Sequence, residues 1–325
     1  MMRLNVSLSH ARFGGDIYMN VDTPVERYEV GEKLVYVKRD DLCCPFPGPN
    51  NAKARGVYKY MKMLANCGIE NFGVLDTKIS RSGWIVAWVG QKLGVKVYDF
   101  YPVYRDDTGL RFTQKMAKAL GAELFGQPGS MQWWRYYQAK AEMTKVGGHM
   151  LPDMLKLSTS VEEVASVVEK TNKRYLKGTI IISVGSGIML AGVMKGLKRK
   201  DVYPDIYGVL VTRNSKKRVE KNVLRFLPVL DNMKVWSCLK LVDPGYEYLE
   251  KELCETPFPC DVYYDRKAWK WLVDNLDKLK EPILFWNIGG EWDAECGLCN
   301  GLRGDGIVTP EQVEEFLKEV DVCQH

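Results

Sequence analysis

A lysine occupies the expected start of a helix in the segment Asn50-Asn-Ala-Lys53-Ala-Arg55-Gly. Acidic side chains are the usual choice there, because the helix macrodipole places partial positive charge at the N-terminus. If such a lysine is buried, desolvation lowers its pKa, and the neutral amine can attack a carbonyl carbon. Lys53 is therefore a candidate for Schiff-base chemistry, with an exposed lysine on a surface helix as the alternative.

A glycine-rich turn follows an apolar stretch at Ser183-Val-Gly185-Ser186-Gly187. Glycines let backbone N–H groups approach an anion, and the start of the next helix adds positive potential. The turn lacks the lysine of a nucleoside-triphosphate loop and the full glycine spacing of a dinucleotide loop. It therefore predicts a site for a single phosphate, with a plain strand-to-helix turn as the alternative.

Two serines lie between another expected strand and helix, in the segment Ser80-Arg-Ser82-Gly83. Their hydroxyl groups and the backbone amides of the helix start could hold a carboxylate. Ligands of α/β proteins bind at the carboxyl ends of the strands. These serines and the glycine turn both have that position, and Lys53 opens a helix just after a loop.

The segments around these residues alternate between short apolar runs and stretches of helical periodicity. Strands are expected at 34–38, 73–76, 95–100, 124–125, 179–184, 206–211 and 283–288, and helices at 52–64, 84–93, 112–120 and 161–175. Helices that alternate with apolar strands predict crossover connections and an α/β fold with parallel sheets. A capping box at Thr309, Pro310 and Gln312 predicts one further helix near the end.

The segment Val35-Tyr-Val-Lys-Arg-Asp-Asp-Leu42, followed by Asn51-Ala-Lys53-Ala-Arg55, resembles the signature of fold-type II pyridoxal-phosphate (PLP) enzymes. It is most similar to the branch of aminocyclopropane-carboxylate deaminase and D-cysteine desulfhydrase. Features that follow in the family's order are Thr23-Pro24, residues 115–124, the glycine turn and residues 285–290. The resemblance implies two domains, each a twisted, mostly parallel sheet flanked by helices. Residues 1–54 and 156–325 would form a large PLP-binding domain, and residues 55–155 a small inserted one.

The resemblance also implies roles for individual residues. Lys53 would bind the cofactor aldehyde, and the turn of Gly185, Ser186 and Gly187 would bind its phosphate. Ser80 and Ser82 would face the substrate carboxylate, beside Tyr263 as the active-site tyrosine. The remaining candidates are Tyr246 as a second tyrosine, and Asn51, Tyr264 and Gly289 as cofactor contacts.

Some positions depart from the family pattern. Ile188 and Met189 stand where the phosphate loop usually carries small or hydroxyl side chains, so their side chains cannot donate to phosphate. Arg81 or Trp84 stands in place of the asparagine near the ring hydroxyl. Tyr264 replaces a glutamate near the pyridine nitrogen. Because a tyrosine stabilises a protonated ring less than a glutamate does, this exchange argues against the deaminase reaction itself.

The resemblance implies a PLP-dependent lyase or deaminase that acts on a small amino acid by elimination or deamination, in a homodimer. One alternative keeps the cofactor but takes an amino acid attached to a nucleobase or to DNA, as in phage DNA hypermodification, with decarboxylation as one outcome. A second alternative is a non-catalytic relative that has lost the cofactor.

Charge is distributed unevenly along the chain, whose formal net charge is +5. Residues 195–225 contain ten lysines and arginines against three acids, and the part from Glu291 onward contains nine acids against two basic residues. The two blocks could pair with each other, or the basic block could bind a polyanion such as nucleic acid. A solvated surface is the alternative.

Nine cysteines at irregular spacing do not suggest a disulfide framework, so we expect a reducing, cytoplasmic location. Cys296 and Cys299 form the one CxxC pair, for which Cys254 and Cys260 are the nearby partners that a zinc site would need. Structural cysteines are the alternative, and we predict no metal centre. No segment is long and apolar enough to suggest a membrane span.

Overall fold

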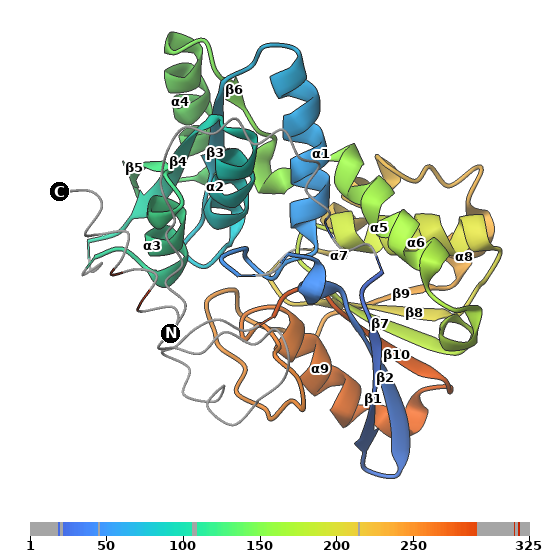
Figure 1. Ribbon diagram of the computed structural model, residues 1–325. Coiled ribbons are helices and arrows are strands. Elements are labelled where there is room, and N and C mark those ends of the chain that lie inside the picture. The colour runs from blue at the N-terminus through green and yellow to red at the C-terminus, as the bar shows by residue number, and fades with distance from the viewer. Residues whose placement is uncertain are drawn as a thin grey trace, which may run out of the picture.

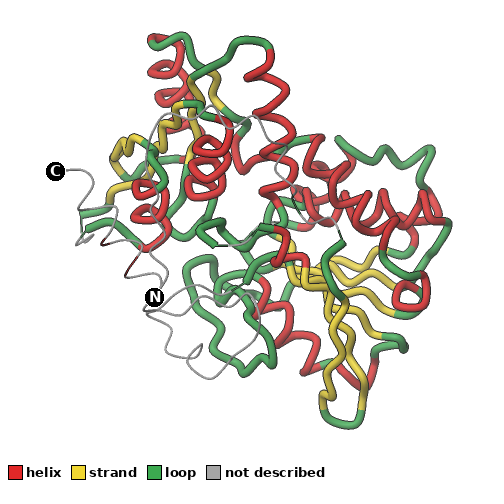
Figure 2. Tube along the Cα trace, in the orientation of Figure 1, coloured by secondary structure: helices red, strands yellow, loops and turns green. Residues whose placement is uncertain are grey.

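A computed structural model describes residues 19, 22–44, 46–105, 109–213, 215–290, 315 and 318. These residues form two sheets, each flanked by helices, with the long helix α1 (Lys53–Asn66) between them (Figure 1). Figure 2 shows the strands of the two sheets as separate groups, with helices and loops around each. The α/β class and the mostly parallel sheets expected from the sequence are therefore confirmed. The domain boundaries at 54/55 and 155/156 stay a prediction.

The larger sheet has six strands in the order β1-β2-β10-β7-β8-β9. Neighbouring strands are parallel, except that β1 and β2 form an antiparallel hairpin at one edge. Their bounds are Val25–Val30 (β1), Lys33–Arg39 (β2), Thr179–Val184 (β7), Asp205–Leu210 (β8), Leu239–Val242 (β9) and Ile283–Asn287 (β10).

Both faces of the larger sheet are covered, which explains why its central strands are apolar throughout. Ile180 and Ile182 of β7 pack in one core with α5 (Ser158–Lys170) and α6 (Ile188–Lys200), while Ile181 packs in another with α9 (Asp265–Asp274). This alternation follows from the two-residue period of a strand. Helices α7 (Lys216–Leu224) and α8 (Met233–Ser237) lie in the crossover from β8 to β9.

The smaller sheet has four parallel strands in the order β5-β4-β3-β6. Helices α2 and α3 pack in a core with α1, and α4 packs against the opposite face of the sheet. The bounds are Asn71–Leu75 (β3), Ser82–Leu93 (α2), Lys96–Val103 (β4), Phe112–Ala119 (α3), Glu123–Pro128 (β5), Gln132–Lys145 (α4) and His149–Met150 (β6).

Helix α1 approaches α5 so closely that a side chain at Gly56 does not fit. A Cβ atom there would lie 2.3 Å from the Cα atom of Ser160. Thr159 adds a hydrogen bond of 2.7 Å to the Gly56 carbonyl. This contact ties the helix that begins with Lys53 to the larger sheet and its helices.

Several expected elements differ from the structure at their ends. The helix expected at 161–175 ends at Lys170, because Thr171 is extended and Asn172 starts a short 3₁₀ turn with its side chain. Tyr246 and Tyr263 lie outside strands, and Tyr264 precedes α9. The capping box at Thr309, Cys296 and Cys299 lie outside the described residues, and so does the acidic block from Glu291 apart from Glu315. Within the described part, no helix has the length and apolarity needed to cross a membrane.

Candidate active site

A cavity of about 310 Å³ lies where the carboxyl ends of strands from both sheets meet. Leu75 of β3, Ser183 of β7 and Ile288 after β10 all line it. The expected site residues that line it are Lys53, Asn51, Ser80, Ser82, Gly185, Ser186, Gly187 and Tyr264. Ligand binding at this edge is the usual behaviour of open α/β sheets. The structure therefore brings together residues that are up to 213 positions apart, from Asn51 to Tyr264.

Lys53 enters the cavity from the first turn of α1. Its backbone N–H donates to Asn51 Oδ1 at 3.1 Å, and Asn51 itself pairs with Gly289 in an isolated antiparallel bridge. Burial, together with the positive charge of Lys156, lowers the pKa of Lys53 to about 8, although Asp265 opposes the shift. A larger share of neutral amine at neutral pH is what attack on an aldehyde requires.

This lowered pKa predicts how stability depends on pH in the cofactor-free protein. Below pH 8 the folded and unfolded states both hold the Lys53 proton, so the desolvation penalty is present in full. Between about pH 8 and 10.5 the folded protein has released the proton while the unfolded chain keeps it. The free energy of unfolding should therefore rise over this range relative to Lys53→Met, as measured by urea denaturation. A difference between the two proteins that stays constant with pH would contradict the lowered pKa.

The glycine turn between β7 and α6 lines the cavity together with Ser82 of α2. Gly187 has φ +89°, which favours glycine, and a Cβ atom there would lie 3.2 Å from Val223 of α7. Asn222 of α7 donates to the Ser186 carbonyl at 2.9 Å. The first amides of α6 have no carbonyl partner in a preceding turn, so they can bind a phosphate even though Ile188 offers no side-chain donor.

Asp265, which was not predicted from the sequence, lines the cavity and connects three segments by hydrogen bonds. It accepts hydrogen bonds from the Ser183 hydroxyl at 2.8 Å and from the backbone N–H groups of Ile288 at 3.2 Å and Gly289 at 3.1 Å. These contacts join the ends of β7 and β10 to the start of α9. Burial raises the pKa of Asp265 to about 7. Its position directly after the tyrosine pair at 263–264 was the available signal.

Ser80, in the loop before α2, and Ser82, the first residue of α2, are positioned by the buried carboxylate of Asp76. Ser80 donates its hydroxyl to Asp76, and the backbone N–H of Ser82 donates to Ser80 Oγ at 3.2 Å. Burial raises the pKa of Asp76 to about 6. Asp99 lies next to it, and burial together with the charge of Asp76 raises the pKa of Asp99 well above its usual range. The loop is thus fixed with its hydroxyl groups at the cavity.

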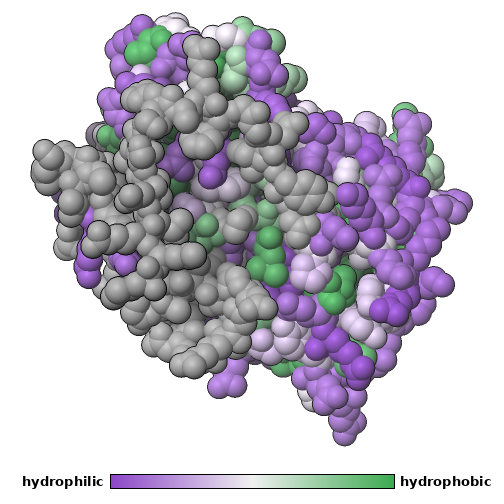
Figure 3. Space-filling model, in the orientation of Figure 1, coloured by the Kyte–Doolittle hydropathy of each residue, from purple (hydrophilic) through white to green (hydrophobic). Residues whose placement is uncertain are grey.

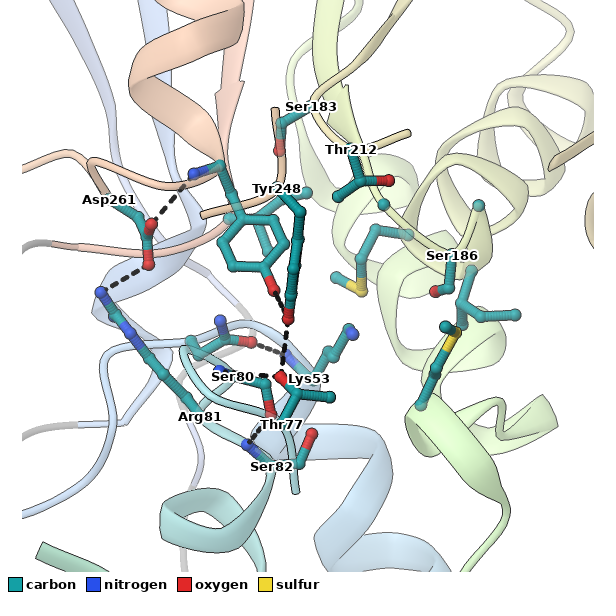
Figure 4. A pocket seen from close by; sticks show the side chains of 18 of the residues that line it. Lys53, Thr77, Ser80, Arg81, Ser82, Ser183, Ser186, Thr212, Tyr248 and Asp261 are labelled. Atoms are coloured by element: carbon teal, nitrogen blue, oxygen red, sulfur yellow. Dashed lines mark hydrogen bonds and ion pairs between the residues drawn. The ribbon is translucent and has the colours of Figure 1, made fainter. Parts of the chain in front are cut away.

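Arg81 is one of the two residues expected in place of the family's asparagine, and the structure shows what it contacts. Its guanidinium forms an ion pair of 2.7 Å with Asp261, and both side chains are at least nine-tenths buried. It also donates to the backbone carbonyl of Pro49 at 3.1 Å. Arg81 therefore joins the loop before α2 to the loop before α9 and to the segment that leads into Lys53 (Figure 4).

The tyrosines at the cavity are Tyr248 and Tyr264. Tyr264 donates to the Tyr248 hydroxyl at 3.1 Å, and that hydroxyl lies 2.6 Å from Thr77 Oγ1 (Figure 4). Burial raises the pKa of Tyr264 well above its usual range. The expected Tyr263 and Tyr246 are not among the described residues that line the cavity. Instead, the ammonium group of Lys251 lies over the ring of Tyr263, and that of Lys267 lies over the ring of Tyr246. The tyrosines that line the cavity are therefore Tyr248, two positions after Tyr246, and Tyr264, directly after Tyr263.

Three residues after β8 also line the cavity and were not singled out beforehand: Thr212, Arg213 and Arg218. Gly289, an expected cofactor contact, does not line it and supports Asn51 and Asp265 instead. Cys254 and Cys260 belong to no cluster of three metal-ligating side chains among the described residues.

Comparison with known proteins identifies relatives along most of the chain. No model of a known protein family matches it. It is 35% identical over 278 residues to the glycyl-dTMP PLP-dependent decarboxylase of Pseudomonas phage M6, which covers 82% of this chain and 98% of the relative. Among solved structures, it resembles an ACC deaminase homologue with a TM-score of 0.69 and 19% identity, over 84% of this chain and 91% of that one. It also resembles the O-acetylserine-dependent cystathionine beta-synthase of Helicobacter pylori, with a TM-score of 0.60 and 16% identity, over 88% and 97%.

The residues of the cavity fit PLP. Lys53 supplies an amine of lowered pKa, and Gly185–Gly187 supplies a turn in which a side chain at Gly187 would be strained. Both line the same cavity, where a phosphate and an aldehyde of one small molecule can reach them. The chain therefore belongs to the fold-type II PLP-dependent enzymes.

Proposed function

We propose that this enzyme decarboxylates an amino acid that is carried on a thymidine nucleotide, as the name of the phage M6 relative describes for that protein. The identity of 35% over nearly the whole relative is the observation that carries the proposal. Deamination or elimination of a small free amino acid is the rival reaction, and its support comes from structures below 20% identity.

The cavity residues suit the removal of a carboxyl group. When bound, PLP supplies an electron sink for negative charge at an α-carbon. The bond between the α-carbon and the carboxyl carbon breaks, CO₂ leaves, and the α-carbon takes up a proton. Lys53 is the group that would deliver this proton, since its pKa of about 8 lets it hold or release one near neutral pH.

The loop before α2 and the start of that helix offer the substrate carboxylate a hydroxyl group rather than a free cation. Ser82 lines the cavity, whereas the single hydroxyl proton of Ser80 is donated to Asp76 and the guanidinium of Arg81 is paired with Asp261. A cation that bound the carboxylate tightly would stabilise the ground state more than the transition state, in which the charge is leaving that group. Neutral donors that orient the carboxylate therefore favour decarboxylation.

The proposal also explains why arginines line the cavity. Arg213 and Arg218 both line it and are exposed; Arg213 is paired with Glu247, whereas Arg218 forms no ion pair with any residue that the structure describes. A nucleotide carries a phosphate that a free small amino acid lacks, and arginine binds phosphate well. The alternative of a relative without cofactor is not supported, because the lysine and the glycine turn line one cavity. The homodimer that the resemblance implies stays a prediction.

A direct assay separates the reactions. The purified holoenzyme is incubated with glycyl-dTMP or with free glycine, and the products are identified by mass spectrometry together with CO₂ and ammonia measurements. We expect one CO₂ for each glycyl-dTMP consumed, an amine that keeps its nitrogen, and no turnover of glycine. Release of ammonia in place of CO₂ would overturn the proposal in favour of the deaminase reaction.

A further inference from the structure

The basic block of residues 195–225 divides into two parts with different surroundings. On α6, Lys195 and Arg199 form ion pairs with Glu162 of α5 at 2.5 and 2.6 Å, and Lys200 donates to a backbone carbonyl of α5. The face formed by these helices is largely hydrophilic (Figure 3). The acids of α5 neutralise much of this part, which leaves it a poor surface for a polyanion.

Among the residues that the structure describes, no acid forms an ion pair with the part on α7. Five exposed cationic side chains make no ion pair with any residue that the structure describes: Lys216, Lys217, Arg218, Lys221 and Arg225. Glu220 is the single acidic residue in the α7 sequence. Lys217 and Lys221 lie one turn apart on the same side of the helix, so their charges add along it.

Helix α7 lies directly beside the candidate active site. Its buried face packs on the glycine turn through Val219 and Val223, which lie 3.3 and 3.2 Å from the position of a Cβ atom at Gly187. Arg218, one residue before Val219, lines the cavity and is exposed. The row of cations therefore begins at the rim of the cavity and continues along the outer side of the helix.

The positive charges on and just after α7 act on the pKa of Lys156, whose charge acts in turn on Lys53. Burial lowers the pKa of Lys156, and the charges of Arg218 and Arg225 lower it further, although Asp153 opposes them. Lys156 in turn lowers the pKa of Lys53. Like charges repel one another here in the absence of a ligand, and a positive cleft of this kind attracts and concentrates anions.

The number of cations exceeds what a single nucleotide needs. The nine residues of α7 extend over about 13 Å at 1.5 Å per residue. That length exceeds the axial spacing of phosphates on one strand of a duplex, about 3.4 Å, so more than one phosphate of a strand can face the helix. A mononucleotide brings one phosphate, so most of the α7 cations would remain without a partner. A strand brings phosphates to the whole helix.

We propose that α7 binds the backbone phosphates of a nucleic-acid strand whose modified thymidine enters the cavity. This rests on the proposed function, because it takes the substrate amino acid to be linked to a nucleotide. The reactive amine lies inside a cavity, so the target base must come from a single strand or leave its duplex to reach Lys53.

Anisotropy of a fluorescein-labelled single-stranded thymidine oligonucleotide tests this surface in the holoenzyme. The Lys217→Gln/Lys221→Gln variant should bind the strand at least about tenfold more weakly at 50 mM salt. The slope of log K against log salt should become shallower by about 1.4, at about 0.7 for each lost phosphate contact on a single strand. A matched control is Lys115→Gln/Lys118→Gln, an exposed pair on α3, which should bind like the wild type. The cofactor absorbance of both variants shows that they are folded.

Other outcomes decide between the sources of phosphate. If free dTMP displaces the strand at equal concentration, or if both double variants bind like the wild type, the strand-binding surface is overturned. Decarboxylation of glycyl-dTMP by an enzyme that does not bind the strand at low salt overturns this inference and leaves the proposed function. Strand binding that depends on α7 without decarboxylation supports the surface and removes the proposed function.

Discussion

Replacing Lys53 with alanine should lower decarboxylase activity by about 10²–10⁴-fold, the usual contribution of a positioned acid–base group. The variant loses the amine that we expect to bind the cofactor aldehyde and to move the proton at the α-carbon. Borohydride reduction of the wild-type holoenzyme, followed by peptide mass spectrometry, should find a pyridoxyl group on the peptide that contains position 53. The variant should show none.

The control for this prediction is Lys59→Ala on the same helix. Lys59 is exposed and pairs with Glu163 at 2.8 Å, away from the cavity lining. This variant should keep the pyridoxyl group at position 53 and its absorbance. A pyridoxyl group on a different lysine of the wild-type protein would show that Lys53 is not the cofactor lysine.

Replacing Arg81 with methionine should lower the free energy of unfolding by about 3–5 kcal/mol, because it leaves the buried Asp261 carboxylate without its cation. Both side chains of this ion pair are at least nine-tenths buried. The same change removes the hydrogen bond to Pro49, so the loop before α2 loses its attachment to the segment before Lys53. Urea denaturation of the holoenzyme measures the first effect, and titration with PLP measures the second as weaker binding.

A second substitution at Asp261 separates the effect of the unpaired charge from the other effects of Arg81→Met. In Arg81→Met/Asp261→Asn, the asparagine oxygen can still accept the backbone N–H groups of Tyr263 and Tyr264, as Asp261 does at 2.8 and 3.0 Å. The buried charge is gone, so the double variant should recover about 0.5–3 kcal/mol relative to Arg81→Met. Equal stability of the two variants would rule out the proposed role of the charge.

An exposed ion pair serves as the comparison for Arg81. Lys96 and Glu123 lie 3.0 Å apart with about half of each side chain exposed. Lys96→Met should change the free energy of unfolding by less than about 1 kcal/mol, because water screens the charges of a surface pair. A much larger loss of unfolding free energy in Arg81→Met than in Lys96→Met would show that the effect at Arg81 depends on burial of its ion pair.

Local sequence was sufficient to predict the α/β fold, the PLP family and the turn at Gly185–Gly187. These features depend on residues that are close in sequence, such as an apolar strand followed by glycines and a helix, or a lysine within a short motif. Lys53 was found in this way, and the structure places it in the cavity. Its assignment as the cofactor lysine stays a prediction until the reduction experiment is done.

Only the three-dimensional arrangement showed which neighbours complete the site. Tyr248 rather than Tyr246 reaches the cavity, and the loop that carries both has no periodicity from which a direction could be predicted. Asp265 acquires its role by accepting hydrogen bonds from Ser183 of β7 and from Gly289, which follows β10.

The basic block shows the same limit for charge. Counting residues 195–225 predicts one cationic region, but the acids that neutralise the α6 part lie about 30 positions earlier, on α5. Electrostatic energy depends on distance in space and on burial, which are not encoded in the spacing of charges along the chain. Pairing across the fold therefore decides which cations remain available to a ligand.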